Sequence, residues 1–360
     1  MSEKEPTRVV VGLSGGVDSS AAASLLVEQG FDVIGITLKV WPQDCVSRAE
    51  DKCCGPQAVM DARSVADKLD IPYYLIDESK EFQSEVIDYF AAEYKAGRTP
   101  NPCVMCNEKL KFGNLINRAK KLGAEYVATG HYARLEKRNG RIVMLRGKDL
   151  HKDQTYFLFS LGQEQLAHMM FPLGELQKAE TREVARCVSL KTAEKQESQE
   201  ICFVPDKDYK KFLTTAGLVD EHQGEIVNSQ GQVLGVHDGI EFYTIGQRKG
   251  LGISSPKPMY VIELDPPKRN QVVVGGEEML LRTEFYIDRC NWIPFEKLES
   301  PIEALAAIRY NHPGANASVE PVDNGKALVR LHEPQRAITP GQACVFYQDD
   351  LVVGGGWIMR

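Results

Sequence analysis

The sequence of 360 residues lacks several features that mark whole classes of protein. It has no apolar run long enough to cross a membrane, and its polar opening stretch MSEKEPTR does not resemble an export signal. It also has no internal repeat and no low-complexity tract. We therefore expect a cytoplasmic protein without a membrane partner, whose nine cysteines are thiols, ligands or catalysts rather than a disulfide framework.

The chain has no overall positive charge, since its formal net charge is −7. The charges are unevenly distributed, however. Residues 44–93 hold 5 Lys/Arg and 12 Asp/Glu, whereas residues 98–154 hold 13 Lys/Arg and 5 Asp/Glu. The basic stretch is either the footprint of a polyanion or a set of solvated helix faces.

Hydrophobic periodicity divides the chain into differently built parts. The first part alternates buried-strand runs such as RVVVGL with helical patterns such as DARSVADKLDI, which predicts an α/β domain with a parallel sheet. It also predicts a hairpin turning at Asn139-Gly140 and a helix over residues 154–170. Short strands broken by glycine and proline follow, as in a small β-barrel. We predict an N-terminal domain (1–212), a small central domain (213–280) and a C-terminal β-barrel (281–360).

The stretch VVVGLSGGVDSS leaves a buried strand, passes through Gly15-Gly16 and enters a helix. Glycines let the backbone approach an anion, and the free N–H groups of a helix start point toward it. Ser14, Ser19 and Ser20 add hydroxyl donors. Because no Gly-Lys-Ser/Thr follows, this is not a Walker A loop. The alternative is a purely structural turn.

SGGVDSS resembles the signature of the PP-loop ATP pyrophosphatases, which cleave ATP between the α and β phosphates. GRTPNPCVMCNEKLKF, ATGHYAR, KDQTYFL, SQEICFV, YTIGQRKGLGI and PGQACVFY occur in an order similar to that of the tRNA-specific 2-thiouridylases. The resemblance runs from about Arg8 to Trp357. It implies a PP-loop α/β domain and ATP-dependent replacement of oxygen by sulfur at carbon 2 of a wobble uridine in tRNA of the Lys, Glu and Gln type.

The resemblance also implies the residues that bind ATP. Asp18 is expected in the neighbourhood of the nucleotide and Mg²⁺ and is expected to assist catalysis; an acidic residue in the first turn of a helix is the structural alternative. Leu38 is expected to meet adenine through its backbone. The expected nucleotide-binding residues are Gly12, Leu13, Ser14, Gly15, Gly16, Val17, Asp18, Ser19, Leu38 and Gly130.

The chemistry needs two cysteines close in space, one carrying a persulfide and one cleaving its sulfur–sulfur bond. By resemblance, Cys106 is the nucleophile and Cys202 the persulfide carrier, and the two form a disulfide during turnover. A helix expected at residues 108–122 would favour the Cys106 thiolate. The chain has Cys103 where a common form of the family has Asp. Cys103, Cys106 and Cys202 are therefore alternatively the ligands of a 4Fe–4S cluster, and zinc is a third possibility.

The resemblance further implies contacts with RNA and with a sulfur donor, either a cysteine desulfurase or a sulfur-relay protein; no DNA partner is expected. Cys187, Cys290 and Cys344 are predicted to be core residues, and no role is assigned to Cys45, Cys53 or Cys54. The alternatives for the whole protein are another PP-loop thiolase or amidating enzyme, and a non-catalytic tRNA-binding cluster protein. The residues expected at the target base are Asn101, Pro102 and Cys103, and those expected to contact tRNA are His131, Lys152, Asp153, Gln154, Arg309, Tyr310 and Gln342.

Overall fold

The computed structural model describes residues 5–40, 55–195, 201–204, 208–220, 222–265 and 270–360. Cys45, Cys53 and Cys54 lie outside these ranges. The chain forms two compact units. Unit 1 comprises Met1–Val86, Cys103–Lys207 and Asp350–Val352, and unit 2 comprises Ile87–Pro102, Asp208–Asp349 and Val353–Arg360. The domain boundaries expected after residues 212 and 280 stay a prediction.

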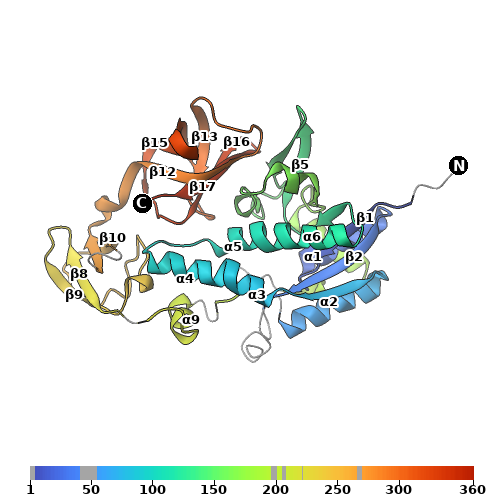
Figure 1. Cartoon of the computed structure of the whole chain (residues 1–360), viewed down its shortest axis with the longest axis horizontal. Coiled ribbons are helices and arrows are strands. Elements are labelled where there is room, and N and C mark those ends of the chain that lie inside the picture. Colours follow the sequence, from blue (N-terminus) through green and yellow to red (C-terminus); the bar gives the residue numbers. More distant parts are fainter. Residues whose placement is uncertain (1–4, 41–54, 196–200, 205–207, 221, 266–269) are drawn as a thin grey trace. The chain divides into compact units, whose positions relative to one another are not determined.

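Unit 1 is built on a parallel sheet in the strand order β3-β2-β1-β4-β7, which confirms the α/β prediction. Its central strand β1 (Arg8–Gly12) is covered on both faces. Val9 and Val11 pack in one core with α1 (Val17–Glu28) and α2 (Pro56–Leu69). Gly12 is one residue further along and so belongs to the opposite face of β1, where it lies against Leu115 of α6. Figure 1 shows α1, α2 and α6 beside these strands.

The remaining elements of unit 1 follow the predicted alternation of strand and helix. The hairpin at Asn139-Gly140 is confirmed by β5 and β6, which pair from Ala133↔Arg146 to Arg138↔Arg141. The bounds are β2 Asp32–Lys39, β3 Tyr73–Asp77, α3 Ser79–Phe82, η2 Gln83–Ile87 (entering unit 2), α5 Pro102–Met105 (starting in unit 2), η3 Cys106–Asn114, α6 Leu115–Lys121, β4 Tyr126–Ala128, β5 Ala133–Arg138, β6 Arg141–Arg146, η4 Thr155–Phe157, α7 Gln163–Ala167, β7 Met169–Met170, α8 Lys178–Cys187 and η5 Lys191–Glu194.

The helix expected over residues 154–170 is wrong. The segment holds the short 3₁₀ turn η4, the short helix α7 and the edge strand β7. Its apolar side chains, among them Tyr156, Leu158 and Phe159, are buried all round rather than along one helical face. Gly162 then separates this buried run from α7. Burial on every side gives an apolar run that periodicity cannot assign to helix or to loop.

The core position predicted for Cys187 is also wrong, because its side chain is exposed. α8 buries Thr181 and Ala185, which lie four positions apart on one face. Cys187 follows Ala185 by two positions, which turns it to the opposite side of a helix with 3.6 residues per turn. The buried face of α8 is therefore narrower than its sequence suggested.

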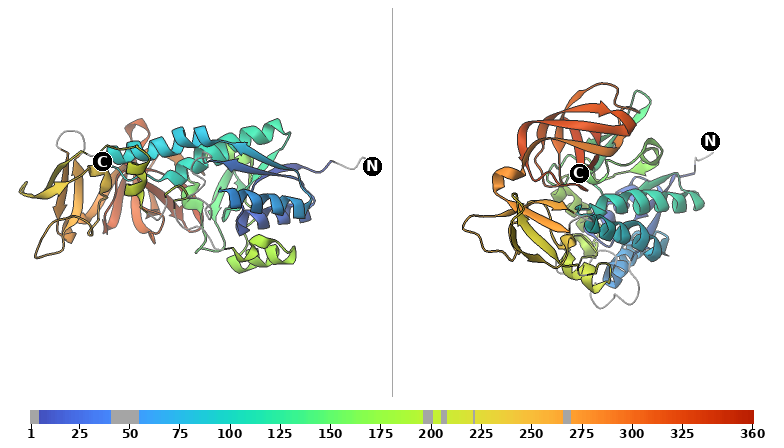
Figure 2. Two further views of the ribbon diagram at one scale, coloured as in Figure 1. Left: turned by 90° about the horizontal axis from the view of Figure 1, so that it is seen from below. Right: turned by 60° about the vertical axis from the view of Figure 1, so that its left-hand side comes forward.

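Unit 2 contains a small sheet and a barrel. The sheet has the order β10-β11-β8-β9. The barrel runs β12-β15-β14-β13-β16-β17, and β17 pairs back with β12, which closes it and confirms the predicted C-terminal β-barrel. The curved red strands in the right view of Figure 2 show this closure. Cys344 is buried in the barrel core, as predicted, and Cys290 is partly buried against it.

The α-helices of unit 2, α4 and α9, are short and come before its strands in the chain. Their aromatic side chains join α4 to α9, since Tyr94 stacks on Tyr209 at a ring distance of 4.6 Å. The bounds are α4 Asp88–Lys95, α9 Tyr209–Thr215, β8 Gly224–Asn228, β9 Val233–His237, η7 Ile240–Phe242, β10 Tyr260–Asp265, β11 Gln271–Gly275, η8 Glu277–Leu280, β12 Leu281–Trp292, β13 Ile302–Ala307, β14 Ala315–Val322, η9 Asp323–Gly325, β15 Lys326–Arg336, β16 Ala343–Gln348 and β17 Leu351–Ile358.

Candidate functional site

The glycine-rich loop lies between β1 and α1 at the carboxyl edge of the parallel sheet. Gly15 has φ +70°, and a β-carbon there would lie 2.2 Å from the carbonyl oxygen of Ala58. The Ser14 N–H donates to Ser19 Oγ at 3.1 Å, and the two hydroxyl oxygens are also 3.1 Å apart. Backbone conformation and hydroxyl contacts thus hold one loop shape, with the start of α1 behind it, as an anion cradle requires.

Two further predicted nucleotide-binding residues belong to the same edge of the sheet. A β-carbon at Gly130 would lie 2.6 Å from the backbone nitrogen of Ser19, so Gly130 lies directly against the first turn of α1. Leu38 lies near the end of β2, two residues beyond Ile36, which pairs with Gly12. The structure therefore brings Gly12–Ser19, Leu38 and Gly130 to one edge of unit 1. Their contacts with ATP stay a prediction.

Asp18 projects from the first turn of α1 into a set of contacts that sequence reasoning missed. Lys178 Nζ lies 2.6 Å from Asp18 Oδ1, and the side chain of Lys178 is only 13% exposed. The Tyr132 hydroxyl donates to the same carboxylate oxygen at 2.9 Å and lies 2.9 Å from Thr181 Oγ1. An ammonium and a phenol thus compensate a half-buried carboxylate. Lys178 is 160 residues away in sequence, and no local signal indicates it.

A second lysine that the sequence did not indicate contacts the loop itself. Lys195 Nζ donates to the carbonyl oxygen of Gly15 at 3.1 Å and to Asp61 Oδ2 at 2.7 Å. It follows the 3₁₀ helix η5, whose residues pack against α1, α2 and α8. Lys178 and Lys195 therefore place two positive charges beside a loop that is shaped for an anion.

Cys103 and Cys106 lie on one continuous helical run. The run begins at Pro102, so the helix start expected at residue 108 is wrong, and Cys106 lies inside the run rather than before its N-terminus. Proline favours this start because its missing N–H is not needed there. Both cysteines are partly exposed, whereas Val104, Met105 and Asn107 are buried. Spaced three apart, the two thiols share the exposed side of the run.

Cys202 lies in the turn Ile201–Val204, which Val204 closes by donating its N–H to the carbonyl oxygen of Ile201 at 3.1 Å. Phe203 anchors this turn, since its buried ring meets Phe82 edge-on at 5.6 Å. The neighbouring Cys202 is left partly exposed. Cys106 and Cys202 both belong to unit 1, although they are far apart in sequence.

The predicted iron–sulfur ligand set receives no support from the geometry. Within the described ranges, which include Cys103, Cys106 and Cys202, no group of three or more His, Cys, Asp or Glu side chains is arranged to hold a metal ion. The three cysteines are therefore not gathered as a cluster site would require.

Of the predicted RNA-contacting residues of unit 1, His131 lies among aromatic side chains. Burial, and to a lesser degree the charge of Lys111, lowers the pKa of His131 well below 6.5, so its ring is neutral at pH 7. The His131 ring lies near Phe112 and Phe171, and its Nδ1 is 2.8 Å from Thr129 Oγ1. A neutral ring among aromatic side chains is suited to stacking with a base.

Asp153 and Gln154 have structural contacts of their own. The buried Asp153 carboxylate accepts from Thr155 Oγ1 at 2.8 Å and from the Gly147 N–H at 3.1 Å, and burial raises its pKa. Gln154 Oε1 accepts from the Tyr132 N–H at 3.1 Å. Lys152 is partly exposed. These bonds hold the loop of residues 147–155 in place, so a contact with RNA would come from its exposed parts, and that contact stays a prediction.

Unit 2 carries the remaining predicted residues. Asn101 is buried, at the end of a segment held by the barrel: the Gln342 side-chain amide donates to the carbonyl oxygens of Thr99 at 3.0 Å and Pro100 at 3.1 Å. The Thr99 N–H donates to the carbonyl oxygen of Pro340 at 2.8 Å. Elsewhere in the barrel, Arg309 and Tyr310 are exposed beyond the end of β13.

Comparison with known proteins assigns a family to this arrangement. Family profiles match in succession: a tRNA methyl transferase HUP domain at residues 7–206, a tRNA methyl transferase PRC-barrel domain at 210–276 and an aminomethyltransferase beta-barrel domain at 282–358. The tRNA-specific 2-thiouridylase MnmA of Clostridium perfringens is 50% identical over 352 residues, covering 98% of both chains. That of Moorella thermoacetica is also 50% identical, covering 97% of this chain and 98% of that protein. Although all three profiles carry a methyltransferase name, these full-length relatives are thiouridylases.

Among solved structures, a 4-thiouridine synthetase–RNA complex with bound ATP is 16% identical over 59% of this chain and 50% of that chain, with a TM-score of 0.35. Within the described ranges, no helix is both long enough and apolar enough to span a bilayer.

Proposed function

The chain belongs to the tRNA-specific 2-thiouridylase family of PP-loop, ATP-utilising enzymes, and from this premise we propose that it thiolates carbon 2 of the wobble uridine in tRNAs of the Lys, Glu and Gln type. The observation that carries the proposal is that one compact unit contains both an anion-shaped SGG loop and the two cysteines that the chemistry needs.

The residues at the edge of the sheet fit an adenine nucleotide and its metal ion. Gly15 lets the loop pass close to the backbone of Ala58, and Gly130 lets its strand end pack directly against the first turn of α1, whose backbone N–H groups would face the nucleotide. Asp18 would hold Mg²⁺, since a carboxylate oxygen is the ligand this ion prefers. Lys178 and Lys195 would bind phosphate oxygens, and the backbone of Leu38 would meet the adenine.

ATP is a substrate whose role is to turn a poor leaving group into a good one. Uracil O2 attacks the α-phosphate and pyrophosphate leaves, so that the oxygen can later depart with AMP. The terminal sulfur of a Cys202 persulfide then attacks carbon 2, and AMP leaves. The Cys106 thiolate attacks the Cys202 sulfur, the sulfur–sulfur bond breaks, and the thiolated uridine is released with a Cys106–Cys202 disulfide. A thiol reductant must reduce this disulfide before the next turnover.

The persulfide route is favoured over cluster chemistry by the arrangement of the three cysteines, because no metal-holding group is formed among the described residues. In this route Cys103 is a neighbour of the target base rather than a ligand. Its place beside Cys106 on the exposed side of one helical run suits that role. The sulfur would come from a cysteine desulfurase or a relay protein.

The RNA contacts follow from the same premise. Asn101, Pro102 and Cys103 would line the uridine, which must leave its base stack to be reached. His131 and the residue 152–154 loop of unit 1, and Arg309 and Tyr310 of unit 2, would contact tRNA. Gln342 would act through the segment of Thr99 and Pro100 that its amide holds.

The test measures tRNA-dependent release of AMP and pyrophosphate together with mass spectrometry of the tRNA nucleosides. Wild-type protein with ATP, Mg²⁺ and a persulfide donor is expected to form 2-thiouridine. Cys106→Ser and Cys202→Ser are each expected to abolish it, with ATP binding unchanged. Cys187→Ser is the matched control, since this exposed cysteine lies outside the site. Release of ADP, or a thiolated product that persists in both variants, would refute the proposal.

A further inference from the structure

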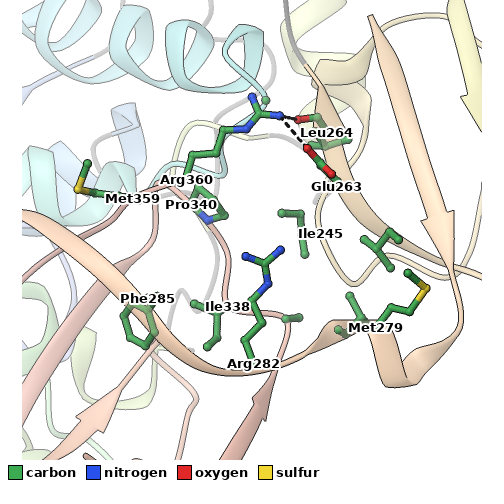
Figure 3. A pocket seen from close by; sticks show the side chains of 14 residues that line it. Ile245, Glu263, Leu264, Met279, Arg282, Phe285, Ile338, Pro340, Met359 and Arg360 are labelled. Carbon is green, nitrogen blue, oxygen red and sulfur yellow. Dashed lines mark hydrogen bonds and ion pairs between the residues drawn. The ribbon is translucent and has the colours of Figure 1, made fainter. Parts of the chain in front are cut away.

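A cavity of about 260 Å³ lies in unit 2, and none of the residues assigned above lines it. Its walls come from β10, η8, the start of β12, the segment before β16 and the last residues of the chain. Ile245, Ile338 and Met279 make much of the wall apolar (Figure 3). The cavity is larger than a single phosphate ion needs, and its apolar walls favour a ligand with a less polar body.

Two arginines reach this cavity, but only one of them has its charge compensated. Arg360 donates to the carbonyl oxygen of Leu264 and lies 3.6 Å from Glu263 Oε1 and 3.9 Å from Asp265 Oδ1. The side chain of Arg282, which is exposed, makes no hydrogen bond or ion pair within the part of the chain that the structure describes. Figure 3 shows its guanidinium group pointing into the middle of the cavity. In the cavity, the Glu263 carboxylate is therefore already paired with Arg360, whereas the Arg282 guanidinium group has no carboxylate paired with it.

The ligand class follows from these groups. An uncompensated guanidinium group recognises planar or tetrahedral oxyanions through two parallel hydrogen bonds. A phosphate diester combines such an oxyanion with ribose carbons, which suit the apolar walls. Glu263 is engaged by Arg360 at 3.6 Å, and Arg360 also faces Asp265 at 3.9 Å, so neither carboxylate pairs with Arg282.

The cavity is connected to the surface that is expected to contact tRNA. Arg309 Nη1 donates to the carbonyl oxygen of Arg336 at 3.4 Å, at the end of β15. The same end of β15 pairs with the start of β12, where Gln335 lies opposite Arg282. Arg309 and Arg282 therefore both lie beside the same end of β15. A polyanion that contacts Arg309 can extend from there to Arg282.

We propose that this cavity receives a backbone phosphate of the bound tRNA, with Arg282 donating to its oxygens. The proposal rests on the proposed function for the presence of tRNA and adds a binding site to it.

The experiment measures the affinity of the full-length protein for unmodified substrate tRNA at several salt concentrations. Arg282→Gln is expected to weaken binding by about tenfold at low salt and to reduce the slope of log K against log salt by about one unit. Arg330→Gln is the matched control. It removes the same charge from the same barrel, but Arg330 is already paired with Glu284 and Glu320. Its affinity and slope are expected to match the wild type.

Three results would overturn the proposal. An unchanged slope for Arg282→Gln would show that no phosphate is bound there. Equal losses in both variants would show a general effect of net charge. Arg282-dependent binding of inorganic phosphate or AMP to the protein alone, with Kd below about 1 mM, would assign the cavity to a free phosphate compound instead.

The outcome for the proposed function is separate. If the wild type thiolates tRNA and Arg282→Gln binds it with the wild-type slope, only the cavity proposal fails. If the wild type does not bind tRNA at all, both fail.

Discussion

The SGG loop of unit 1 and the segment before Asn101 in unit 2 are both held by residues that are distant in sequence, but by different forces. At the loop, Lys178 and Lys195 contact a carboxylate and a carbonyl oxygen through positive charges. At the segment, Gln342 and Pro340 use neutral hydrogen bonds to the backbone of Thr99 and Pro100. Charged contacts can be exchanged for a bound phosphate or metal ion, whereas neutral backbone contacts keep one geometry throughout. The loop is therefore held by contacts that a bound anion or metal ion could replace, whereas the segment is held by backbone hydrogen bonds.

The largest expected effect comes from Gly15→Ala. A β-carbon there meets the backbone of Ala58 at 2.2 Å, and φ +70° itself costs about 1–2 kcal/mol for an alanine. Because backbone atoms cannot move aside cheaply, the loop must change shape, and ATP binding measured by calorimetry is expected to weaken by about a hundredfold.

Gly30→Ala is the control for this substitution. It has a similar φ of +82°, but no atom lies within 4 Å of the added carbon. It should lower the melting temperature without changing ATP affinity. Equal ATP affinities in the two variants would contradict the importance of the close contact at Ala58.

A smaller effect is expected from Gln342→Ala, which removes both donated hydrogen bonds to Thr99 and Pro100. If Gln342 positions the segment that leads to Asn101 at the target base, kcat for thiolation should fall about tenfold, because a small displacement at the reacting atoms is costly. KM for tRNA should stay within about twofold of the wild-type value. Steady-state kinetics with the purified enzyme provide the measurement.

Gln348→Ala is the matched control for Gln342, since that amide also donates to a backbone oxygen of unit 2, that of Glu303, at 2.8 Å. It should leave both constants unchanged. A raised KM with an unchanged kcat for Gln342→Ala would instead support the direct tRNA contact that the sequence resemblance implies.

The smallest effect is expected from breaking the Asp18–Lys178 pair in the protein without ATP. A double-mutant cycle with Asp18→Asn and Lys178→Met should give a coupling free energy of about 1–2 kcal/mol, since the pair is only partly exposed to solvent. The measurement is urea unfolding. The pair of Arg186 and Glu194, which is far more exposed, should give a value near zero. Similar values for both pairs would mean that the loop contact is an ordinary surface ion pair.

Much of the fold could be predicted because its signals are local. The continuous apolar run of β1 and the Ala62, Val65 and Ala66 face of α2 each appear in a few consecutive residues, and the structure buries them as expected. The helix start near Cys106 and the helix over residues 154–170 were predicted wrongly, because tertiary packing rather than periodicity decides them.

In the candidate site, too, some residues could be predicted from local sequence signals and others could not. The SGG loop and the cysteine motifs were recognisable from their spacing and resemblance alone. Lys178, Lys195 and the contact of Gln342 with Thr99 were not, because a lysine at a helix start or a glutamine in a loop carries no signal until its partner is known.

By itself, the sequence indicated the type of chemistry: the glycine loop after a buried strand and the motifs around Cys106 and Cys202 resemble those of the tRNA-specific 2-thiouridylases. Only the tertiary structure decided which charges stand beside the loop, which backbone the barrel holds, and which arginine is left uncompensated. The physical reason is that residue types limit which bonds can be made, whereas ion pairs and hydrogen bonds form only between groups that folding brings within a few ångströms of each other.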